Sequence, residues 1–264
     1  MKRKALVVGG TAGIGEGIAL QLARRGVDVT IAGRSAQRGN AIVQAMTQLS
    51  PSNHFAFARV DCFDLDDVRD LAQRTAQGPL DYLILTQGIA TTQGFTPTQH
   101  DLDQKLTVHY YSRILLAQIL APAMATGSSD PRILLVLSAG VHGTYAHWED
   151  DPGLRRHYTL KNAADAAGFY TDIALDQLAA QTPGVVFAHA APGFVATSWG
   201  TELNAFLRGI MRALQCCCGR DKEECGKRLL GGLLGLPKDT GGVCLLDKEG
   251  RATPNPRPEH AAAK

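Results

Sequence analysis

A glycine-rich segment near the N-terminus limits the folds open to this chain: Gly9-Gly10-Thr11-Ala12-Gly13-Ile14-Gly15. It follows a short apolar run, Leu6–Val8, and opens a helical pattern that extends to Arg25. Gly9 permits a tight turn, Gly13 lets a phosphate approach the backbone, and Gly15 lets the helix pack close to a sheet. The free N–H groups at the helix start attract negative charge. The segment therefore predicts a strand, a turn and a helix that bind the pyrophosphate of a dinucleotide.

Short apolar runs alternate with longer helical patterns along most of the chain, which predicts an α/β fold: a Rossmann-type, doubly wound parallel sheet of about seven strands. We expect one domain over 1–264, with a helical segment at 198–237 covering the substrate cleft and an extended tail at 250–264. A long helix is expected from Asp101 to Ala125, and another from Asn162 to Ala180. The expected strands are Leu6–Val8, Val27–Ala32, Phe55–Val60, Leu80–Leu85, Ile133–Leu137, Val185–Ala188 and Val243–Leu246.

Composition and charge argue against several other classes of protein. The formal net charge is +2 and no basic stripe is interleaved with aromatic residues, so nucleic acid is not an expected partner. No apolar run reaches the ~18 residues of a membrane span. The six cysteines form no disulfide framework, which favours reduced thiols in the cytoplasm. Cys216-Cys217-Cys218 and Cys225 lack metal-ligand spacing, so no metal site is predicted.

The second expected strand ends in Gly33-Arg34-Ser35, and in this fold that end meets the adenosine ribose. An acidic residue would accept a hydrogen bond from the ribose 2′-hydroxyl, whereas arginine suits a 2′-phosphate. No Asp or Glu is present there, so Arg34 favours NADP(H) over NAD(H). Ser35 is placed to cap the helix that follows.

The glycine spacing, G-x-x-x-G-x-G, resembles the short-chain dehydrogenase/reductase family, whose loop reads T-G-x-x-x-G-I-G; Val8 stands where the family has threonine. The resemblance runs from residue 4 to about residue 200. It implies that Asp61-Cys62 lies near the adenine and that Pro192-Gly193-Phe194-Val195-Ala196-Thr197 contacts the nicotinamide. Of the family's N-N-A-G, Leu85-Thr86-Gln87-Gly88 keeps the glycine. The implied cofactor residues are Gly9, Thr11, Gly13, Ile14, Gly15, Arg34, Ser35, Asp61, Cys62, Gly88, Pro192, Gly193, Val195 and Thr197.

The catalytic pattern of that family is incomplete here. Its carbonyl reductases use a serine, an asparagine and the tyrosine and lysine of Y-x-x-x-K. Ser138 resembles the serine, and His109 stands at the asparagine position, where it could bind the backbone, titrate near neutral pH or simply pack. No Y-x-x-x-K occurs. Tyr158 and Lys161 form Y-x-x-K, whose members share one face of a helix and could substitute.

A different register follows from the interval to Pro192, which places the tyrosine position at Asn162–Ala164 and the lysine position near Ala167 or Gly168. Both catalytic residues are then absent. Asp165 lies beside the empty tyrosine position, where an apolar cleft would raise its pKa and let it act as an acid, or pair with a cationic substrate. His142, His147 and His157 bracket the loop after Ser138, but no spacing singles one out.

Each candidate also has an ordinary explanation: a glycine turn without ligand, a surface arginine, a serine at a strand end, a solvated aspartate. The function we expect is an NADP(H)-dependent oxidoreductase acting on a carbonyl, alcohol or imine of an apolar small molecule, with a non-standard proton donor. Analogy extends this to secondary metabolism of fungal type. The alternatives are a non-redox isomerase or cyclase, or an inactive nucleotide-binding scaffold. The resemblance implies a homodimer as one arrangement, which the residues do not fix.

Overall fold

A computed structural model describes residues 2–193, 195 and 220–253. They form one eight-stranded sheet in the order β3-β2-β1-β4-β5-β6-β7-β8. Strands β1 to β7 are parallel, and β8 pairs antiparallel with β7 at the edge. The strands are β1 Lys4–Val8, β2 Asp28–Gly33, β3 Phe55–Arg59, β4 Tyr82–Leu85, β5 Arg132–Val136, β6 Val186–Ala190, β7 Val243–Leu246 and β8 Ala252–Thr253.

The predicted α/β architecture is confirmed, and each of the seven expected strands agrees with an observed strand within two residues at either end. The additional strand, β8, lies in the region expected to be an extended tail. The helices are α1 Gly13–Arg24, α2 Ala36–Leu49, α3 Leu65–Ala76, α4 Gln104–Leu106, the π-helical turn η1 Thr107–Tyr111, α5 Ser112–Gly127, α6 Leu160–Gln181 and α8 Lys222–Gly235.

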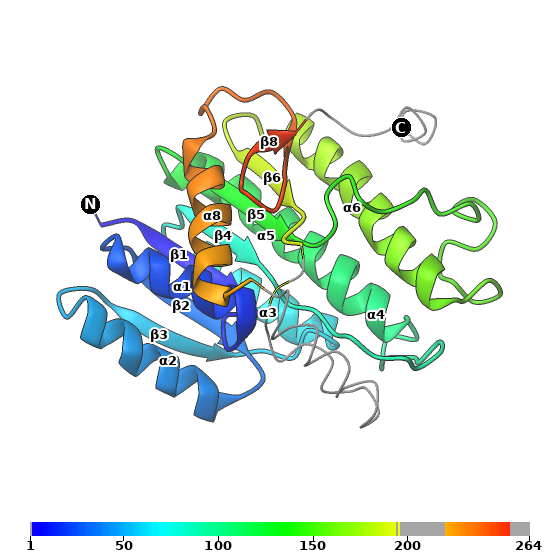
Figure 1. Ribbon diagram of the computed structural model, residues 1–264, viewed down its shortest axis with the longest axis horizontal. Coiled ribbons are helices and arrows are strands. Elements are labelled where there is room, and N and C mark those ends of the chain that lie inside the picture. The colour runs from blue at the N-terminus through cyan, green and yellow to red at the C-terminus, as the bar shows by residue number, and fades with distance from the viewer. Residues whose placement is uncertain (1, 194, 196–219, 254–264) are drawn as a thin grey trace.

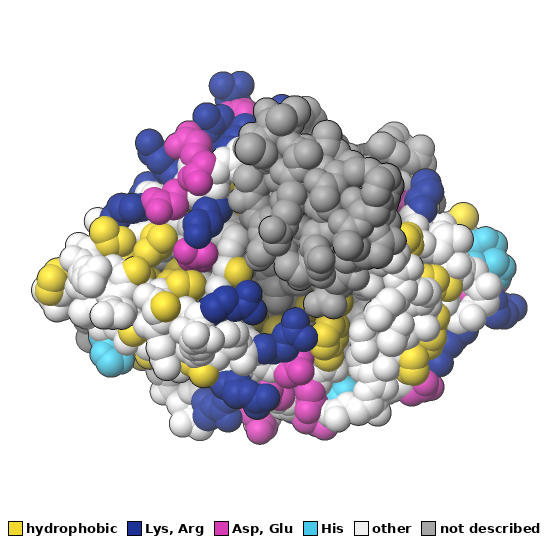
Figure 2. Space-filling model, turned by 60° about the horizontal axis from the view of Figure 1, so that its bottom comes forward, with side chains coloured by type: hydrophobic (Ala, Val, Ile, Leu, Met, Phe, Trp, Pro, Cys, Tyr) yellow, Lys and Arg dark blue, Asp and Glu magenta, His cyan; other side chains and the backbone are white. Residues whose placement is uncertain are grey.

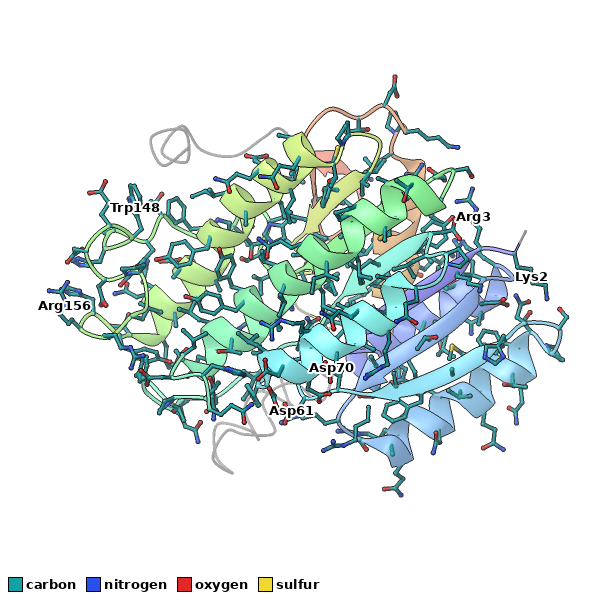
Figure 3. All side chains as sticks on the ribbon, turned by 180° about the vertical axis from the view of Figure 1, so that it is seen from behind. Lys2, Arg3, Asp61, Asp70, Trp148 and Arg156 are labelled. Atoms are coloured by element: carbon teal, nitrogen blue, oxygen red, sulfur yellow. The ribbon has the colours of Figure 1, made fainter. Side chains whose placement is uncertain are left out.

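Helices cover both faces of the sheet (Figure 1). One apolar core joins α1, α2 and α8 to one face, and a second joins α3, α5 and α6 to the other. The view from behind shows α3, α5 and α6 in front (Figure 3). Because strands covered on both faces have no solvated side, β1, β4, β5 and β6 are apolar almost throughout.

The strand order reverses between β1 and β4, and in open α/β sheets the ligand crevice lies at the carboxyl ends of the strands beside such a reversal. Val8 and Leu85 are paired there, so the segments after β1 and β4 start side by side. The Gly9 amide donates to the Ala32 carbonyl at 2.9 Å, and the Thr86 amide to the Val8 carbonyl at 2.9 Å. These bonds fix the floor of the crevice.

The expectation of a cleft cover at 198–237 is wrong for its last part, because α8 belongs to a helix layer and packs along α1. Gly17 and Gly226 permit this approach: a Cβ on Gly17 would lie 2.2 Å from the Lys222 carbonyl oxygen, and one on Gly226 would lie 2.6 Å from the Gly17 carbonyl carbon. Residues 198–219 of the expected cover lie outside the described residues.

The surface carries mixed charge. On the face in Figure 2, the described basic and acidic side chains lie beside one another, in keeping with the small net charge. In the described part of the chain, no helix is both long and apolar enough to cross a bilayer.

Candidate functional site

The glycine segment forms a cradle between β1 and α1. Gly9 and Gly13 adopt φ angles of +81° and +58°, which L side chains rarely adopt. A Cβ on Gly15 would lie 2.4 Å from both the Gly9 carbonyl oxygen and the Thr86 Oγ1, so this position has no room for a side chain. The segment therefore folds as its glycines predicted.

The N-terminus of α1 is the open end of that cradle. Its N-cap residue, Ala12, supplies no side-chain hydrogen bond, which leaves the first amide N–H groups of the helix facing the crevice. Uncapped N–H groups and the positive end of the helix dipole suit a phosphate group. By contrast, side chains cap the other long helices that open with an extended N-cap: Ser35 for α2, Asp64 for α3, Thr159 for α6 and Asp221 for α8.

Arg34 follows the carboxyl end of β2, where the ribose is expected. Its guanidinium lies over the ring of Phe63, 5.2 Å from the ring centroid, and the residue is exposed. Among the described residues, no carboxylate lies within ion-pair distance of Arg34. Ser35 accepts a hydrogen bond from the Arg38 amide at 3.3 Å, which confirms its predicted capping role.

The segment after β3 is held by its own hydrogen bonds. Asp61 accepts a bond from the Phe63 amide at 3.1 Å and donates its own amide to Asp67 at 2.7 Å. Cys62 is buried, and burial raises the pKa of its thiol to about 12. Because the thiol faces the core, Cys62 can offer a cofactor only its backbone.

Gly88 and the segment after β6 border the crevice from the other side. A Cβ on Gly88 would lie 3.0 Å from Nε2 of His109. Gly193 has a φ angle of +70°, and Val195 forms a parallel bridge with Arg220. Thr197 lies outside the described residues.

His109 sits in the π-helical turn that joins α4 to α5, where a single long helix was predicted. Its Nε2 accepts a hydrogen bond from the Ile89 amide at 3.1 Å. Burial, with Arg113 nearby, lowers the pKa of His109 to about 3, so the ring is neutral at physiological pH. Of the roles expected for it, backbone binding is the one found, and titration near neutral pH is not.

The Tyr158–Lys161 pair does not form. Tyr158 precedes the N-cap Thr159, so it lies outside α6 and the helical face that would align it with Lys161 does not exist. Its hydroxyl lies 2.6 Å from Nζ of Lys105 and donates to the Gln93 carbonyl at 3.3 Å. Burial raises the pKa of Tyr158 to about 12. The expected substitution of this pair for Y-x-x-x-K is therefore not what the structure shows.

Asp165 is held as a carboxylate. Burial alone would raise its pKa, but hydrogen bonds from Lys161 and from the Gly143 amide, at 2.9 Å, bring the pKa below its usual value. The expectation of a raised pKa and an acidic role is thus wrong, because the helical neighbour four residues earlier supplies a cation. Lys161 itself is 80% exposed along its side chain and points to Asp165.

Ser138 follows β5 at the end of the crevice. Its amide donates to Nε2 of His189 at 3.2 Å, and its Oγ lies 3.3 Å from Nδ1 of His142. A Cβ on Gly168 would lie 2.4 Å from the His142 ring and 2.6 Å from the Ser138 Oγ. The space where the sequence placed a lysine side chain is therefore filled by His142.

Comparison with known proteins decides the family. A family model described as short chain dehydrogenase matches residues 3–150, more than half of the chain. The chain belongs to the short-chain dehydrogenase family. The resemblance inferred from the glycine spacing is thereby confirmed.

Relatives of this short-chain dehydrogenase include the polyprenol dehydrogenase of Mus musculus, 31% identical over 84% of this chain and 68% of that protein. Oxidoreductase AN1596 of Emericella nidulans is 32% identical over 74% of this chain. The match spans 59% of the length of AN1596 and 58% of that of oxidoreductase andH of Emericella variicolor. Whole-protein activities of these relatives therefore do not transfer directly.

Solved structures share the fold. Levodione reductase superposes with a TM-score of 0.72 at 18% identity, covering 94% of this chain and 96% of that one. A short-chain dehydrogenase from Sphingobium yanoikuyae, solved in complex with NADPH, gives 0.67 at 19% identity, covering 91% and 87%. At such identities the likeness shows the fold alone.

Within the family, this short-chain dehydrogenase has small residues at the tyrosine and lysine positions that follow from the interval to Pro192. Ala163 and Ala167 are buried, and Gly168 faces Ser138. Sequence reasoning noticed His142 without a role for it and missed Asp172 and His189, which contact it or Ser138. Only the position of His142, four residues after Ser138, was available as a signal.

Gly168→Ala should destabilise the protein by about 1–3 kcal/mol, because the methyl group added to α6 would meet the His142 ring. Denaturant unfolding measures the change. Gly231→Ala on α8, where nothing lies within 4 Å of the added Cβ, is the matched control and should not destabilise. Equal stability of the two variants would show that the His142 ring is not packed against Gly168.

Proposed function

We propose that the chain is an NADP(H)-dependent oxidoreductase that interconverts a carbonyl or imine and its reduced form in an apolar small molecule. The observation that carries the cofactor choice is Arg34: it follows β2 with an exposed guanidinium and no carboxylate partner in the described part of the chain. A 2′-phosphate would supply the missing anion. The short-chain dehydrogenase from Sphingobium yanoikuyae, which shares the fold, was solved in complex with NADPH, so this fold can hold the cofactor proposed.

The residues present fit that cofactor. The glycine cradle and the uncapped start of α1 would hold the pyrophosphate, and Arg34 the 2′-phosphate. When bound, NADP(H) supplies or accepts a hydride. We place the reacting carbonyl at Ser138, whose hydroxyl would orient it by a hydrogen bond. Pro192, Gly193 and Val195 would border the nicotinamide.

An apolar substrate is supported by the surface beside Ser138. Val141, three residues after Ser138, is 71% exposed, more than any other large hydrophobic side chain of the described residues. An exposed apolar side chain three residues from the reacting position favours a substrate with apolar surface to cover it.

Arg34→Ala should weaken NADPH binding by tenfold or more while leaving NADH binding unchanged, because only NADPH has the 2′-phosphate. A tenfold change in Kd corresponds to about 1.4 kcal/mol of binding free energy. Isothermal titration calorimetry on the full chain measures both affinities. Arg25→Ala, at the opposite end of α1 from the cradle, is the control. Equal affinity of wild type for NADPH and NADH would refute the cofactor choice. Binding of neither would leave the glycine loop a structural turn.

A second function, a non-redox isomerase or cyclase, is favoured by one observation: neither Tyr158 nor Lys161 hydrogen-bonds Ser138 in the structure. A cleft that only orients a reactive intermediate needs no such pair. Mass spectrometry of the product distinguishes the two functions. Redox turnover changes it by two hydrogen atoms and consumes NADPH, whereas isomerisation does neither.

A further inference from the structure

A closed ring of hydrogen-bonding groups lies behind Ser138. The Ser138 amide donates to Nε2 of His189 at 3.2 Å, and Nδ1 of His189 lies 2.6 Å from Oδ1 of Asp172. The other carboxylate oxygen of Asp172 lies 3.2 Å from Nε2 of His142. Nδ1 of His142 lies 2.9 Å from the Ser138 carbonyl oxygen and 3.3 Å from the Ser138 Oγ. The ring thus starts and ends on the serine.

The ring fixes where protons lie on His189 and Asp172. A backbone amide can only donate, so Nε2 of His189 is an acceptor and its proton is on Nδ1, directed at Asp172. Burial lowers the pKa of His189, which keeps it neutral. Burial alone would raise the pKa of Asp172, but hydrogen bonds from His142 and His189 hold it well below its usual value. Asp172 is therefore a buried carboxylate.

A buried carboxylate requires a cation or several donors beside it. Both ring nitrogens of His142 face oxygen acceptors: the Asp172 carboxylate on one side and Ser138 on the other. The imidazolium, which donates from both nitrogens, matches this arrangement. Two further charged groups act on these histidines: Asp165 of α6 on His142, and Arg113 of α5 on His189. The His142 side chain is 2% exposed, so its partners within the fold set its charge.

We infer that His142, held by Asp172, is the proton source for the Ser138 hydroxyl and takes the part that tyrosine and lysine play elsewhere in the family. The inference rests on the proposed function. Hydride addition to a substrate carbonyl leaves an alkoxide at Ser138. The Ser138 Oγ–H proton passes to the alkoxide, and the His142 Nδ1–H proton passes to Oγ. The substrate gains one hydride and one proton, and His142 is left neutral with its Nε2–H directed at Asp172.

The structure contains a steric requirement for this arrangement. The His142 ring occupies the space that a side chain at position 168 of α6 would fill, and glycine is the residue there. A lysine at position 168 and the His142 ring beside Ser138 would occupy the same space. The histidine can therefore lie there only because the lysine is absent.

Nitrogen NMR of the full chain with ¹⁵N-labelled histidine tests the proton positions without cofactor or substrate. We expect both nitrogens of His142 to be protonated near neutral pH, and His189 to be neutral with its proton on Nδ1. Asp172→Asn should return His142 to a neutral ring. A neutral His142 in wild type, with its proton only on Nδ1, would make it a structural lock on the Ser138 carbonyl and would overturn the inference.

Turnover gives the second readout, with phenanthrenequinone as probe and NADPH as reductant. His142→Gln retains an N–H donor for the Ser138 carbonyl but cannot supply a proton. It should lower kcat at least tenfold with KM changed little. His147→Gln, a half-exposed histidine of the same loop, is the control. A kcat for His142→Gln within twofold of wild type would overturn the inference. Failure to bind NADPH would instead overturn the proposed function, and the nitrogen spectra would still decide the state of His142.

Discussion

Gly15→Ala should destabilise the protein by about 1–3 kcal/mol and abolish NADPH binding at micromolar concentrations. The added Cβ would lie 2.4 Å from the Gly9 carbonyl oxygen, which is backbone and cannot rotate away. It would lie equally close to Oγ1 of Thr86, which is fixed by its hydrogen bond to the Val8 carbonyl at 3.0 Å. Relief of the clash must move α1 away from the turn. The N–H groups that face the crevice then lose their geometry, and stability and binding fall together.

The measurements are denaturant unfolding and calorimetric titration with NADPH. Gly10→Ala separates the two effects, because its Cβ would lie 2.8 Å from the Val7 carbonyl oxygen of β1 and 2.9 Å from the Ile31 side chain, rather than meet the start of α1. It should cost stability with a smaller loss of binding. If Gly15→Ala proved as stable as wild type and bound NADPH normally, the turn between β1 and α1 would be looser than the contacts indicate.

The backbone geometry of the candidate cofactor site was predictable because its determinants are local. Gly9 and Gly13 adopt positive φ angles within the turn that they define, and Arg34 follows its strand directly in the sequence. Strand alternation then places these segments at one edge of the sheet, since parallel strands share their direction. The long helix expected from Asp101 was interrupted by η1, because hydrophobic periodicity does not distinguish an α-helical turn from a π-helical one.

The surroundings of Ser138, where we propose that the proton is supplied, were not predictable in the same way. The pairing of Tyr158 with Lys161 assumed that both were helical, but Thr159 caps α6 and excludes Tyr158. A signal for the state of Asp165 was present, because Lys161 precedes it by one helical turn and such pairs interact.

The ring around Ser138 joins three elements. His142 follows β5, Asp172 lies on α6 and His189 lies on β6, and no periodicity connects them. Two buried histidines around one buried carboxylate are visible only once the fold places them together. Sequence identifies residues that act within one turn of the chain, whereas this part of the site is built by tertiary packing.

Asp151→Asn should lower the free energy of unfolding by about 2–3 kcal/mol at neutral pH, since hydrogen bonds to a charged group are worth about 1.5–3 kcal/mol and cannot be fully replaced by an amide. Asp151 is 4% exposed and organises the loop between Ser138 and α6. Its Oδ1 accepts from the Arg155 amide at 2.8 Å, and its Oδ2 accepts from the Arg156 and His157 amides at 2.9 and 2.8 Å. An asparagine can accept these bonds on one side only, and its NH2 would face donors on the other.

The pH dependence of the effect has a definite sign. Burial alone would raise the pKa of Asp151, but the three amide N–H donors lower it to about 2, below its usual 3.8. A carboxyl whose pKa is depressed in the folded state stabilises the protein above its unfolded pKa and loses that contribution as pH falls through the folded pKa. The difference in stability between wild type and Asp151→Asn should therefore shrink as pH falls between about pH 4 and pH 2. Asp150→Asn is the control: Asp150 is 54% exposed and pairs with Arg156 at the surface, where such pairs contribute at most about 1 kcal/mol. If both variants lost equal stability, or if the Asp151→Asn difference did not change with pH, the carboxylate would not be what orders this loop.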